Sequence, residues 1–435
     1  MNSPTISFSP RESVQLVHAG VCADDIPLSV LDQEYGVQVT CRAYAWTRTL
    51  DAELLRRSLR RLLRCLPQFA GRLVTGRDGS PRIVCADQGA EFSVVRARGR
   101  MPDFDVEHSG AKRLPEWAGR LNGWVTARTP LLRVRITQYE GGGTILGVAI
   151  PHALADAGSI SRLLHMWARI HRGEPCESPD VDRRALIEFE REAAGGLSRS
   201  PLQLARAELR SAKFTARVIA NIRPFVSGVF ELDERGLAPV LAAGDAKLAQ
   251  DLVSAHIWRT LTARERRPTF ELTSVLNLRS RLAPLLSLDY FGNAVGHAVC
   301  RLERAELHGG TLLEVAEAIR AARRKLDNQT VKAEHAAHCL DWKRGTGMML
   351  RDRTTHASLQ GGVCFNSEVG SPLYDVDFGA GRPAWIVRPN FPIPGLGLWS
   401  PGPTPGSFHL RVTLSPEQMR WLASSEGRRA LSPGH

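Results

Sequence analysis

The stretch TILGVAIPHALADAGSISRLLHMWARIHRG, residues 144–173, joins an apolar run, a short polar loop and a helical pattern. The run at 144–150 is nearly unbroken, which is typical of a strand buried on both faces. Apolar residues then recur at helical spacing, at Ile160, Leu163, Leu164, Trp167 and Ile170. We expect Ser159 to be the N-cap of this helix. The loop between strand and helix carries His152 and Asp156, and such loops often display catalytic side chains.

The chain on either side continues an α/β pattern. Leucines at helical spacing predict a helix over 51–66, ended by Pro67, and alternation predicts a half-exposed strand within PLLRVRITQYE, 130–140. In the second half, a helix over 251–266 precedes a strand over 269–279. Two further helices are predicted by a capping box at Thr311 and Glu314, and by Ser415 as N-cap with a proline after it and the box-like Gln418. Additional strands are predicted over 361–369, 384–388 and 408–414.

Length and composition suit a two-domain globular protein: 435 residues, 43% apolar and 23% charged. No apolar run approaches the ~20 residues that span a bilayer, and the first residues do not resemble a signal peptide. The eight cysteines are scattered with no CxxC pair, which favours reduced thiols and a cytoplasmic protein over a disulfide framework or a zinc ribbon. We therefore expect no membrane segment.

The net charge of +12 has two interpretations. It forms a basic surface for an anionic partner, or it reflects arginines spread over the solvated faces of helices. Arginines between leucines at helical spacing, as in LLRRSLRRLLRC, favour the second interpretation. We find no nucleic-acid-binding motif, and GRLVTGRDG and GAGRP fail the Rossmann and P-loop spacings.

Five motifs, taken in order, resemble the BAHD acyltransferases, which belong to the chloramphenicol acetyltransferase-like superfamily. PHALADAG resembles the HxxxDG motif of that family, and YDVDFGAGRP at 374–383 resembles its DFGWG segment. The remaining three are LPQFAGRLV at 66–74, PDVDRRAL at 179–186 and NLRSRLAPLLSLDYFGNAV at 277–295. HxxxD alone is a weak signal, whereas five motifs in the same order are specific.

The resemblance implies an acyltransferase that transfers groups other than aminoacyl groups. It implies a monomer of two chloramphenicol acetyltransferase-like domains, each a mixed β-sheet flanked by helices, with a channel at their interface. We accordingly expect an N-terminal domain at 1–175 with the HxxxD motif, a crossover at 176–225, and a C-terminal domain at 226–435 with YFGN and DFGAG. Coenzyme A thioester is then a co-substrate, with no permanently bound cofactor, and the acceptor is a small molecule, expected from secondary metabolism.

Three positions depart from the family pattern. Ala157 follows the motif aspartate in place of glycine, and Ala380 replaces the aromatic residue of DFGWG. Glu368 stands nine residues before Asp377, where many family members carry tryptophan. Two interpretations of Glu368 remain open: it contacts the acceptor, or it points to solvent.

Acyl transfer requires a base that removes the proton of the attacking hydroxyl or amine. A neutral imidazole suits this role because its pKa of about 6.5 lies near working pH, and His152 is the predicted base. Asp156 could orient His152 as in a serine-protease triad. The resemblance implies instead that Asp156 is structural and pairs with Arg279, and that Asp377 is structural as well.

The developing oxyanion requires a hydrogen-bond donor. Asn366, eleven residues before Asp377, occupies a position where the family often has threonine, and its amide could donate to the oxyanion. The alternative is an asparagine in a turn. The resemblance places Ser254 and Ala255 in the coenzyme A site. We interpret HAAHC at 335–339 as a surface helix rather than a metal site.

Three other functions compete with this hypothesis. An acidic acyl-carrier protein could deliver the thioester to a basic surface, in place of free acyl-CoA. A stand-alone condensation enzyme shares the fold, but such domains carry two adjacent histidines where this chain has Pro151 and His152. The fold could also serve as a binding module without catalysis.

Overall fold

A computed structural model describes the chain except residues 1–11, 36–37, 77–79, 119–125, 197–199, 204, 207–208, 210–211, 214–215, 217–223, 344–361 and 391–393. The first residues, on which the absence of a signal peptide was predicted, thus lie mostly outside the described part. The chain forms two compact units. The first unit comprises 1–199, 287–293 and 372–389, and the second comprises 200–286, 294–371 and 390–435.

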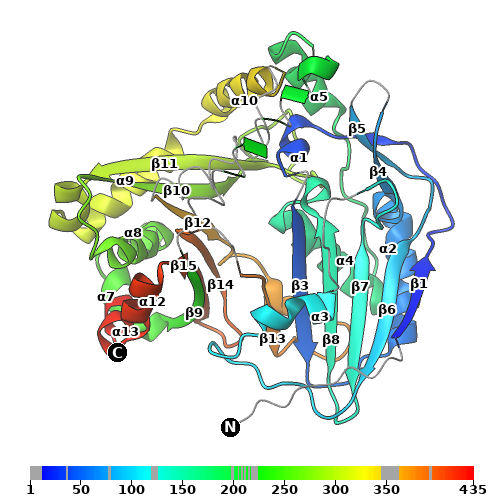
Figure 1. Cartoon of the computed structure of the whole chain (residues 1–435), viewed down its shortest axis with the longest axis horizontal. Helices are drawn as coiled ribbons and strands as arrows, with labels where there is room; N and C mark the ends of the chain where they lie inside the picture. Colours follow the sequence, from blue (N-terminus) through cyan, green and yellow to red (C-terminus); the bar gives the residue numbers. More distant parts are fainter. Residues whose placement is uncertain are drawn as a thin grey trace. The chain divides into compact units, whose positions relative to one another are not determined.

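The first unit is built on a six-stranded mixed sheet (Figure 1). Its strands, in spatial order, are β1 (Glu12–Val17), β6 (Ala90–Ala97), β7 (Arg133–Tyr139), β8 (Thr144–Pro151), β3 (Val39–Trp46) and β13 (Trp385–Val387). The β6–β7 pair is parallel and the other pairs are antiparallel. All eight residues of β8 are buried, which confirms the buried strand expected from the apolar run.

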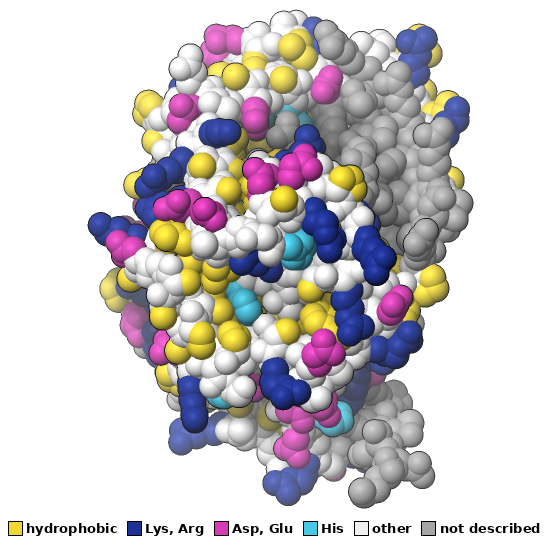
Figure 2. Space-filling model, turned by 90° about the vertical axis from the view of Figure 1, so that its left-hand side faces the viewer, with side chains coloured by type: hydrophobic (Ala, Val, Ile, Leu, Met, Phe, Trp, Pro, Cys, Tyr) yellow, Lys and Arg dark blue, Asp and Glu magenta, His cyan; other side chains and the backbone are white. Residues whose placement is uncertain are grey.

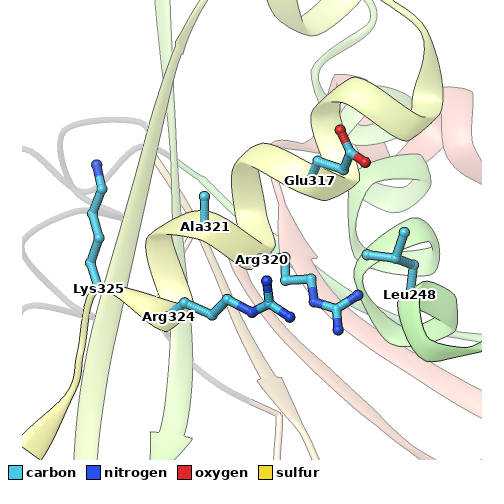
Figure 3. Close-up of a pocket in the computed structure, with 6 residues that line it drawn as sticks. All are labelled: Leu248, Glu317, Arg320, Ala321, Arg324 and Lys325. Atoms are coloured by element: carbon cyan, nitrogen blue, oxygen red, sulfur yellow. The ribbon is translucent and has the colours of Figure 1, made fainter.

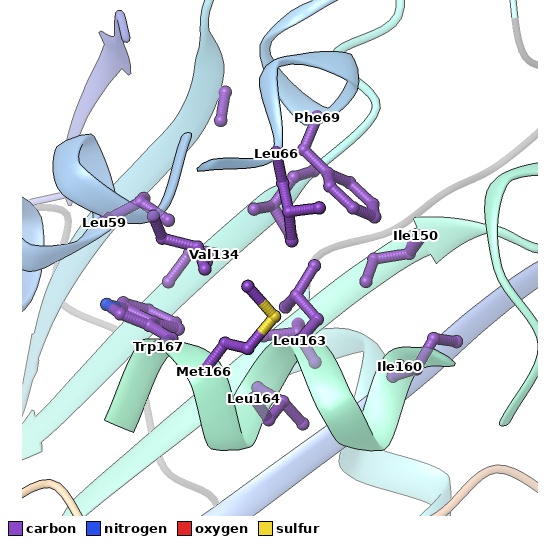
Figure 4. Packing of buried hydrophobic residues seen from close by; sticks show 14 of the residues in the cluster. Leu59, Leu66, Phe69, Val134, Ile150, Ile160, Leu163, Leu164, Met166 and Trp167 are labelled. Carbon is purple, nitrogen blue, oxygen red and sulfur yellow. The ribbon is translucent and has the colours of Figure 1, made fainter. Parts of the chain in front are cut away.

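Both faces of this sheet are covered, which explains why β8 does not alternate. Leu146 and Val148 of β8 belong to the core beneath α2 (Ala52–Cys65) and α4 (Ala157–His171), which pack against each other. Figure 4 shows Leu163, Leu164, Met166 and Trp167 of α4 in that core. Ile145 points the other way and packs with Trp117 of α3 (Leu114–Ala118). Successive strand residues face opposite layers, and here both layers are apolar.

Helix α4 begins three residues earlier than the sequence predicted. Its N-cap is Asp156, whose side chain accepts a hydrogen bond from the Ser159 N–H. The expected cap, Ser159, lies in the first turn. Aspartate and serine are equally good N-caps, so the pattern alone did not separate them.

Shorter elements complete the first unit. They are α1 (Val30–Glu34), α5 (Arg184–Ala193), the short helices η1 (Pro67–Ala70), η2 (Ala111–Arg113), η3 (His152–Leu154) and η7 (Leu373–Asp375), and a small sheet of β2 (Ile26–Pro27), β5 (Pro81–Val84) and β4 (Arg72–Thr75). The predicted helix over 51–66 is confirmed as α2, with Asp51 as its N-cap.

The second unit repeats the architecture with its own six-stranded mixed sheet. The strands, in spatial order, are β11 (Val295–Glu303), β10 (Thr269–Asn277), β12 (Val363–Ser367), β14 (Leu396–Pro401), β15 (Ser407–Leu414) and β9 (Val226–Asp233). Its helices are α7 (Glu234–Leu241), η4 (Ala246–Leu248), α8 (Ala249–Thr262), η5 (Ala305–Gly309), α9 (Leu312–Arg324), α10 (Asn328–Lys343), α12 (Pro416–Ala423) and α13 (Ser425–Leu431). The capping boxes of α9 and α12 both form as predicted. The α/β class with mixed sheets is confirmed.

The units differ from the expected domains because two C-terminal segments fold with the first unit. Residues 372–389 enter it through β13, which pairs with β3. Phe378 of DFGAG packs edge-on against Trp46 and Trp167, with ring centroids 5.8 and 5.1 Å away. Residues 287–293, which contain the whole YFGN motif, also belong to the first unit. The division expected at 175 and 226 therefore does not follow the contacts of the chain.

The distribution of charged side chains on the surface and the state of the cysteines agree with the interpretation of the composition. Figure 2 shows Lys and Arg interspersed with Asp and Glu over the face that it views, in keeping with arginines spread over solvated faces. All eight cysteines are free thiols. Among the described residues, no helix combines the length and the apolar character that crossing a membrane requires.

At Gly147 of β8, the backbone of α3 lies directly against the sheet. A Cβ there would lie 1.9 Å from the Trp117 carbonyl oxygen. We expect Gly147→Ala to lower the free energy of unfolding by at least about 1–3 kcal/mol, because the backbone of α3 would have to move. Thermal melting measures the effect, with Gly309→Ala as control because no atom lies within 4 Å of a Cβ at that position. Equal melting temperatures for the two variants would contradict this packing.

Candidate functional site

His152 stands at the end of β8, at the start of the short helix η3. Its backbone N–H donates to the Gln38 carbonyl oxygen at 2.8 Å, which fixes the main chain at this point. The side chain is half-buried, whereas the next four residues are buried. The buried strand thus presents one imidazole at the edge of the core, as the sequence predicted.

The imidazole of His152 has two neighbours within the first unit. Its Nδ1 lies 3.1 Å from Oδ1 of Asn293. The ring of Tyr35 stacks on it, with centroids 4.4 Å apart and an interplanar angle of 24°. One ring nitrogen is therefore bound and one ring face is covered, so Nε2 is the nitrogen left for chemistry.

Burial lowers the pKa of His152 below the ordinary value of histidine. The negative charge of Asp156 and the hydrogen bonds to Asn293 and to the histidine backbone act against this shift, while the positive charge of Arg42 adds to it. The net result favours a neutral imidazole near neutral pH. A neutral imidazole can accept a proton, which is the requirement for a general base.

Asp156 lies close in sequence to His152 but is bonded elsewhere. Its side chain is 3% exposed and accepts from the Ser159 N–H at 2.9 Å. His152 Nδ1 has Asn293 as its partner instead. Asp156 thus caps α4 and orders the loop, and its pairing with Arg279 stays a prediction.

The motif YFGN surrounds this loop, and each letter has a structural reason. Tyr290 lies under the guanidinium of Arg183, at 5.6 Å, and Phe291 packs edge-on against Phe69.

Gly292 exchanges hydrogen bonds with the Ser159 hydroxyl, and a Cβ there would lie 2.5 Å from the Tyr290 oxygen. Its carbonyl also accepts from the Asp156 N–H. Asn293 is fully buried and contacts His152.

Three residues of this site were missed by the sequence analysis: Asn293, Asp32 and Tyr35. Asp32 accepts from the backbone and the side-chain amide of Asn293, at 3.1 and 2.9 Å. Ser29 and Asp32 have the spacing of a capping box, which forms at the start of α1. That spacing could have located the helix, but nothing in the sequence relates it to His152.

Asp377 closes its own loop within the first unit. Its Oδ1 accepts from the N–H groups of Gly379 and Gly381 at 2.7 and 2.8 Å, and both glycines have positive φ angles of 85° and 84°. The Asp377 carbonyl accepts from Arg172. These contacts are those of a residue that shapes a turn.

The other predicted site residues lie in the second unit. Asn366 is half-buried inside β12, opposite Leu398, rather than in a turn. Glu368 follows that strand and is 7% exposed, so the interpretation in which it points to solvent is not supported. Arg279 is buried and donates to Oδ1 of Asn277.

The two residues predicted to bind coenzyme A lie in α8. The Ser254 hydroxyl donates to the Gln250 carbonyl, one turn earlier in the helix. Ala255 is fully buried in the core of the second unit. Packing accounts for Ala255, and the place of both residues in a coenzyme A site stays a prediction.

The segment HAAHC is helical, as expected, within α10. It is not wholly on the surface, because His335 and Cys339 are buried, with Nε2 and Sγ 3.9 Å apart. These residues lie one turn apart on the same face of the helix, so burial of one face explains both.

A groove of about 530 Å³ lies in the second unit, between α9 and Leu248 (Figure 3). Arg320 and Arg324 extend from α9 toward Leu248, and Ala321 and Lys325 also line the groove. Glu317 is the one carboxylate among its lining residues. The groove is therefore basic, and none of its residues was predicted as a site.

Comparisons with known proteins agree with this architecture. A family model described as the Transferase family matches residues 19–427. The chain is 26% identical to a hydroxycinnamoyltransferase of Narcissus pseudonarcissus over 85% of this chain and 86% of that protein. It is 27% identical to putrescine hydroxycinnamoyltransferase 1 of Oryza sativa subsp. japonica, over 89% and 91% of the two chains.

Solved structures share the fold. Vinorine synthase superposes with a TM-score of 0.69 at 18% identity, covering 94% of this chain and 95% of that one. TRI101 of F. sporotrichioides, solved with coenzyme A and T-2, gives a TM-score of 0.68 at 17% identity, covering 94% and 99%.

The environment of His152 leads to a prediction about its titration. In an NMR pH titration, we expect the His152 ring to protonate at a lower pH than that of His108. Burial lowers the pKa of His152, whereas the hydrogen bond to Asp105 raises the pKa of the exposed His108. His152→Gln and His108→Gln variants assign the two signals. If His152 titrated at or above the pH of His108, the buried environment described here would be wrong.

Proposed function

The chain belongs to the Transferase family, that of the BAHD acyltransferases, and moves an acyl group from acyl-CoA to a small acceptor; from this premise we propose that His152 is the general base. The observation that carries the proposal is the placement of its ring. Nδ1 is bonded to Asn293, one face is stacked on Tyr35, and burial favours the neutral form.

The proposed reaction uses one proton twice. Nε2 of His152 takes the proton from the acceptor's hydroxyl or amine as the acceptor attacks the thioester carbonyl. A tetrahedral oxyanion forms, and its collapse breaks the C–S bond. The imidazolium then returns the proton to the departing sulfur, so that an ester or amide and free coenzyme A leave and His152 is neutral again.

We propose Asn366 as the donor to the oxyanion. An asparagine NH₂ can hydrogen-bond an oxyanion, and the loss of such a donor typically costs about 10²–10³ in rate. Two observations support the assignment. Asn366 is held inside β12, which limits its side-chain freedom, and it is half-buried rather than exposed on a turn.

The structural roles complete the site. We propose that Asp156 and Arg279 form an ion pair that holds the loop after β8, since both are buried charges of opposite sign. Asp377 maintains the DFGAG turn through the N–H groups of two glycines. Ser254 and Ala255 stay assigned to coenzyme A through the family resemblance.

The acceptor is proposed to be an amine. The relatives include a putrescine hydroxycinnamoyltransferase, and the buried Glu368 replaces an aromatic residue of the family pattern. A carboxylate can accept a charge-assisted hydrogen bond from an ammonium or amine group. A hydroxycinnamoyl-CoA with putrescine is therefore the first substrate pair to assay.

An acyl-carrier protein is the alternative donor, and the basic groove on α9 favours it. Arg320, Arg324 and Lys325 form a cationic surface that suits an acidic protein. Calorimetric titration with coenzyme A, acetyl-CoA and an acyl-carrier protein separates the donors. Binding of the carrier protein that is lost in Arg324→Glu would support the alternative, and binding of coenzyme A alone would reject it.

Other aspects of the proposal rest on the sequence. A cytoplasmic protein fits the free cysteines, and a monomer is proposed from the family resemblance. A condensation enzyme is disfavoured because Pro151 precedes His152, and a module without catalysis is disfavoured by the intact His152 and Asp156. No nucleic-acid or membrane partner is proposed.

His152→Ala tests the base directly. We expect turnover of hydroxycinnamoyl-CoA and putrescine to fall by about 10²–10⁴, because general-base catalysis contributes that much. The melting temperature should change little, since His152 is only half-buried. The exposed His108→Ala is the control. A His152→Ala enzyme that kept more than about a tenth of wild-type turnover would exclude His152 as the base.

Glu368→Gln tests the acceptor pocket. We expect the Michaelis constant for putrescine to rise about ten- to a hundredfold, because a hydrogen bond to a charged group is worth about 1.5–3 kcal/mol. The constant for the acyl donor should stay unchanged. Glu417→Gln, at an exposed carboxylate of α12, is the control. Equal small changes in both constants would place Glu368 outside the acceptor pocket.

A further inference from the structure

Asn293 is held by four hydrogen bonds that fix which way its amide points. Its Nδ2 donates to Oδ1 of Asp32 and to the His152 carbonyl, both at 2.9 Å. Its backbone N–H also donates to Oδ1 of Asp32. A carboxylate oxygen and a carbonyl oxygen can only accept, so the NH₂ group must face them. The oxygen of the amide therefore faces His152 Nδ1.

The orientation of this amide determines the tautomer of His152. An amide oxygen can only accept, so the ring nitrogen at 3.1 Å must carry the proton. The neutral ring then has its proton on Nδ1 and its lone pair on Nε2. A reversed amide would direct N–H groups at Nδ1 and favour the opposite tautomer, which has no lone pair on Nε2.

The carboxylate of Asp32 is itself fixed. Its Oδ2 accepts from Nε of Arg183 at 2.7 Å and from the Ser29 hydroxyl at 2.9 Å. The side chains of Asp32 and Arg183 are 0% and 2% exposed. Oδ2 thus accepts from the Arg183 guanidinium and from the N-cap residue Ser29, and Oδ1 is the oxygen that orients Asn293. Breaking one side of such a buried pair exposes an uncompensated charge in the core.

We propose that Asp32 is a positioning residue that sets the tautomer of His152 through the side-chain amide of Asn293. This inference rests on the proposed role of His152 as base, because a lone pair on Nε2 matters only if Nε2 takes the proton. Asp32 contacts neither ring nitrogen in this arrangement. It acts through the intervening side-chain amide of Asn293, whereas the carboxylate of a serine-protease triad bonds the histidine ring directly.

The decisive variant is Asp32→Asn. Arg183 would attract the oxygen of the new amide, which would turn its NH₂ toward the NH₂ of Asn293. Two donors cannot pair, so Asn293 would reverse and direct its own NH₂ at His152 Nδ1. We expect the proton to move to Nε2 and kcat to fall by about 10²-fold or more. The binding of substrates should change little.

A double variant, Asp32→Asn with Asn293→Asp, exchanges the carboxylate and the amide at constant net charge. The carboxylate introduced at position 293 would accept from Nδ1 of His152 on one oxygen and from the amide introduced at position 32 on the other. The Nδ1–H tautomer should return. The acid limb of the pH–rate profile should move to higher pH, because a carboxylate bonded directly to the ring stabilises the imidazolium. The other charges acting on His152 are Asp156 and Arg42, which both variants leave intact.

The primary measurement is the nitrogen NMR spectrum of the His152 ring above its pKa, which distinguishes a protonated from an unprotonated nitrogen without any substrate. Asn328→Ala is the matched control, because the Asn328 amide also donates to two carbonyls, those of Arg281 and Ala283, in the second unit. That variant should lose some stability and keep the tautomer. A purely structural role for Asp32 would lower stability in Asp32→Asn with no change of tautomer.

The outcomes separate this inference from the proposed function. Protonation on Nδ1 in the wild type, on Nε2 in Asp32→Asn and again on Nδ1 in the double variant supports the inference. Protonation on Nε2 in the wild type, or an unchanged tautomer in Asp32→Asn, overturns it. A tautomer that changes as expected while turnover stays constant would reject His152 as base and leave the hydrogen-bond assignment intact. If Asp32→Asn does not fold, the double variant tests the inference. Protonation of His152 on Nδ1, with the acid limb of the pH–rate profile at higher pH, would support it, and protonation on Nε2 would overturn it.

Discussion

The carboxylate of Asp32 joins four segments that are far apart in the sequence. It caps α1, binds the guanidinium of Arg183, and accepts from the backbone and side chain of Asn293, which in turn contacts His152. Removing one partner of a buried pair of this kind typically costs about 3–5 kcal/mol. The loop after β8 therefore keeps its shape because a charge in the core has its partners on two other segments, and one of these partners, Asn293, contacts His152. The imidazole of His152 is at the end of this chain of contacts rather than at its centre.

Local patterns predicted the elements of the fold well, because their causes are local. The unbroken apolar run of β8, the leucines of α2 and the capping boxes of α9 and α12 all formed as expected. The start of α4 was misplaced because Asp156 and Ser159 are both good caps. The unit boundaries were not predictable because β13 has only three residues, and its pairing with β3 bridges more than 300 positions of the chain. Periodicity carries no information about such a pairing.

The site was predictable only in part, for the same physical reason. His152 follows a buried strand, and this position together with the family resemblance led to its prediction as the base. Asn293 and Tyr35 contact this imidazole and Asp32 contacts Asn293, all from segments more than 100 residues away from His152, and no spacing in the sequence relates them. The resemblance to the family identified the YFGN motif, but the reason for each of its letters required the contacts of Arg183, Phe69 and Ser159.

Helix α1 supplies both groups that control the ring of His152, since Asp32 lies within it and Tyr35 is its C-cap. A helix of five residues has little stability of its own and is held by its tertiary contacts. Elements of this kind open locally at a lower free energy than the protein as a whole. One local opening would release the stacked tyrosine and the oriented asparagine together. Heat inactivation would then precede global unfolding, and the useful temperature range of the enzyme would be set by one turn and a half of helix rather than by its two large sheets.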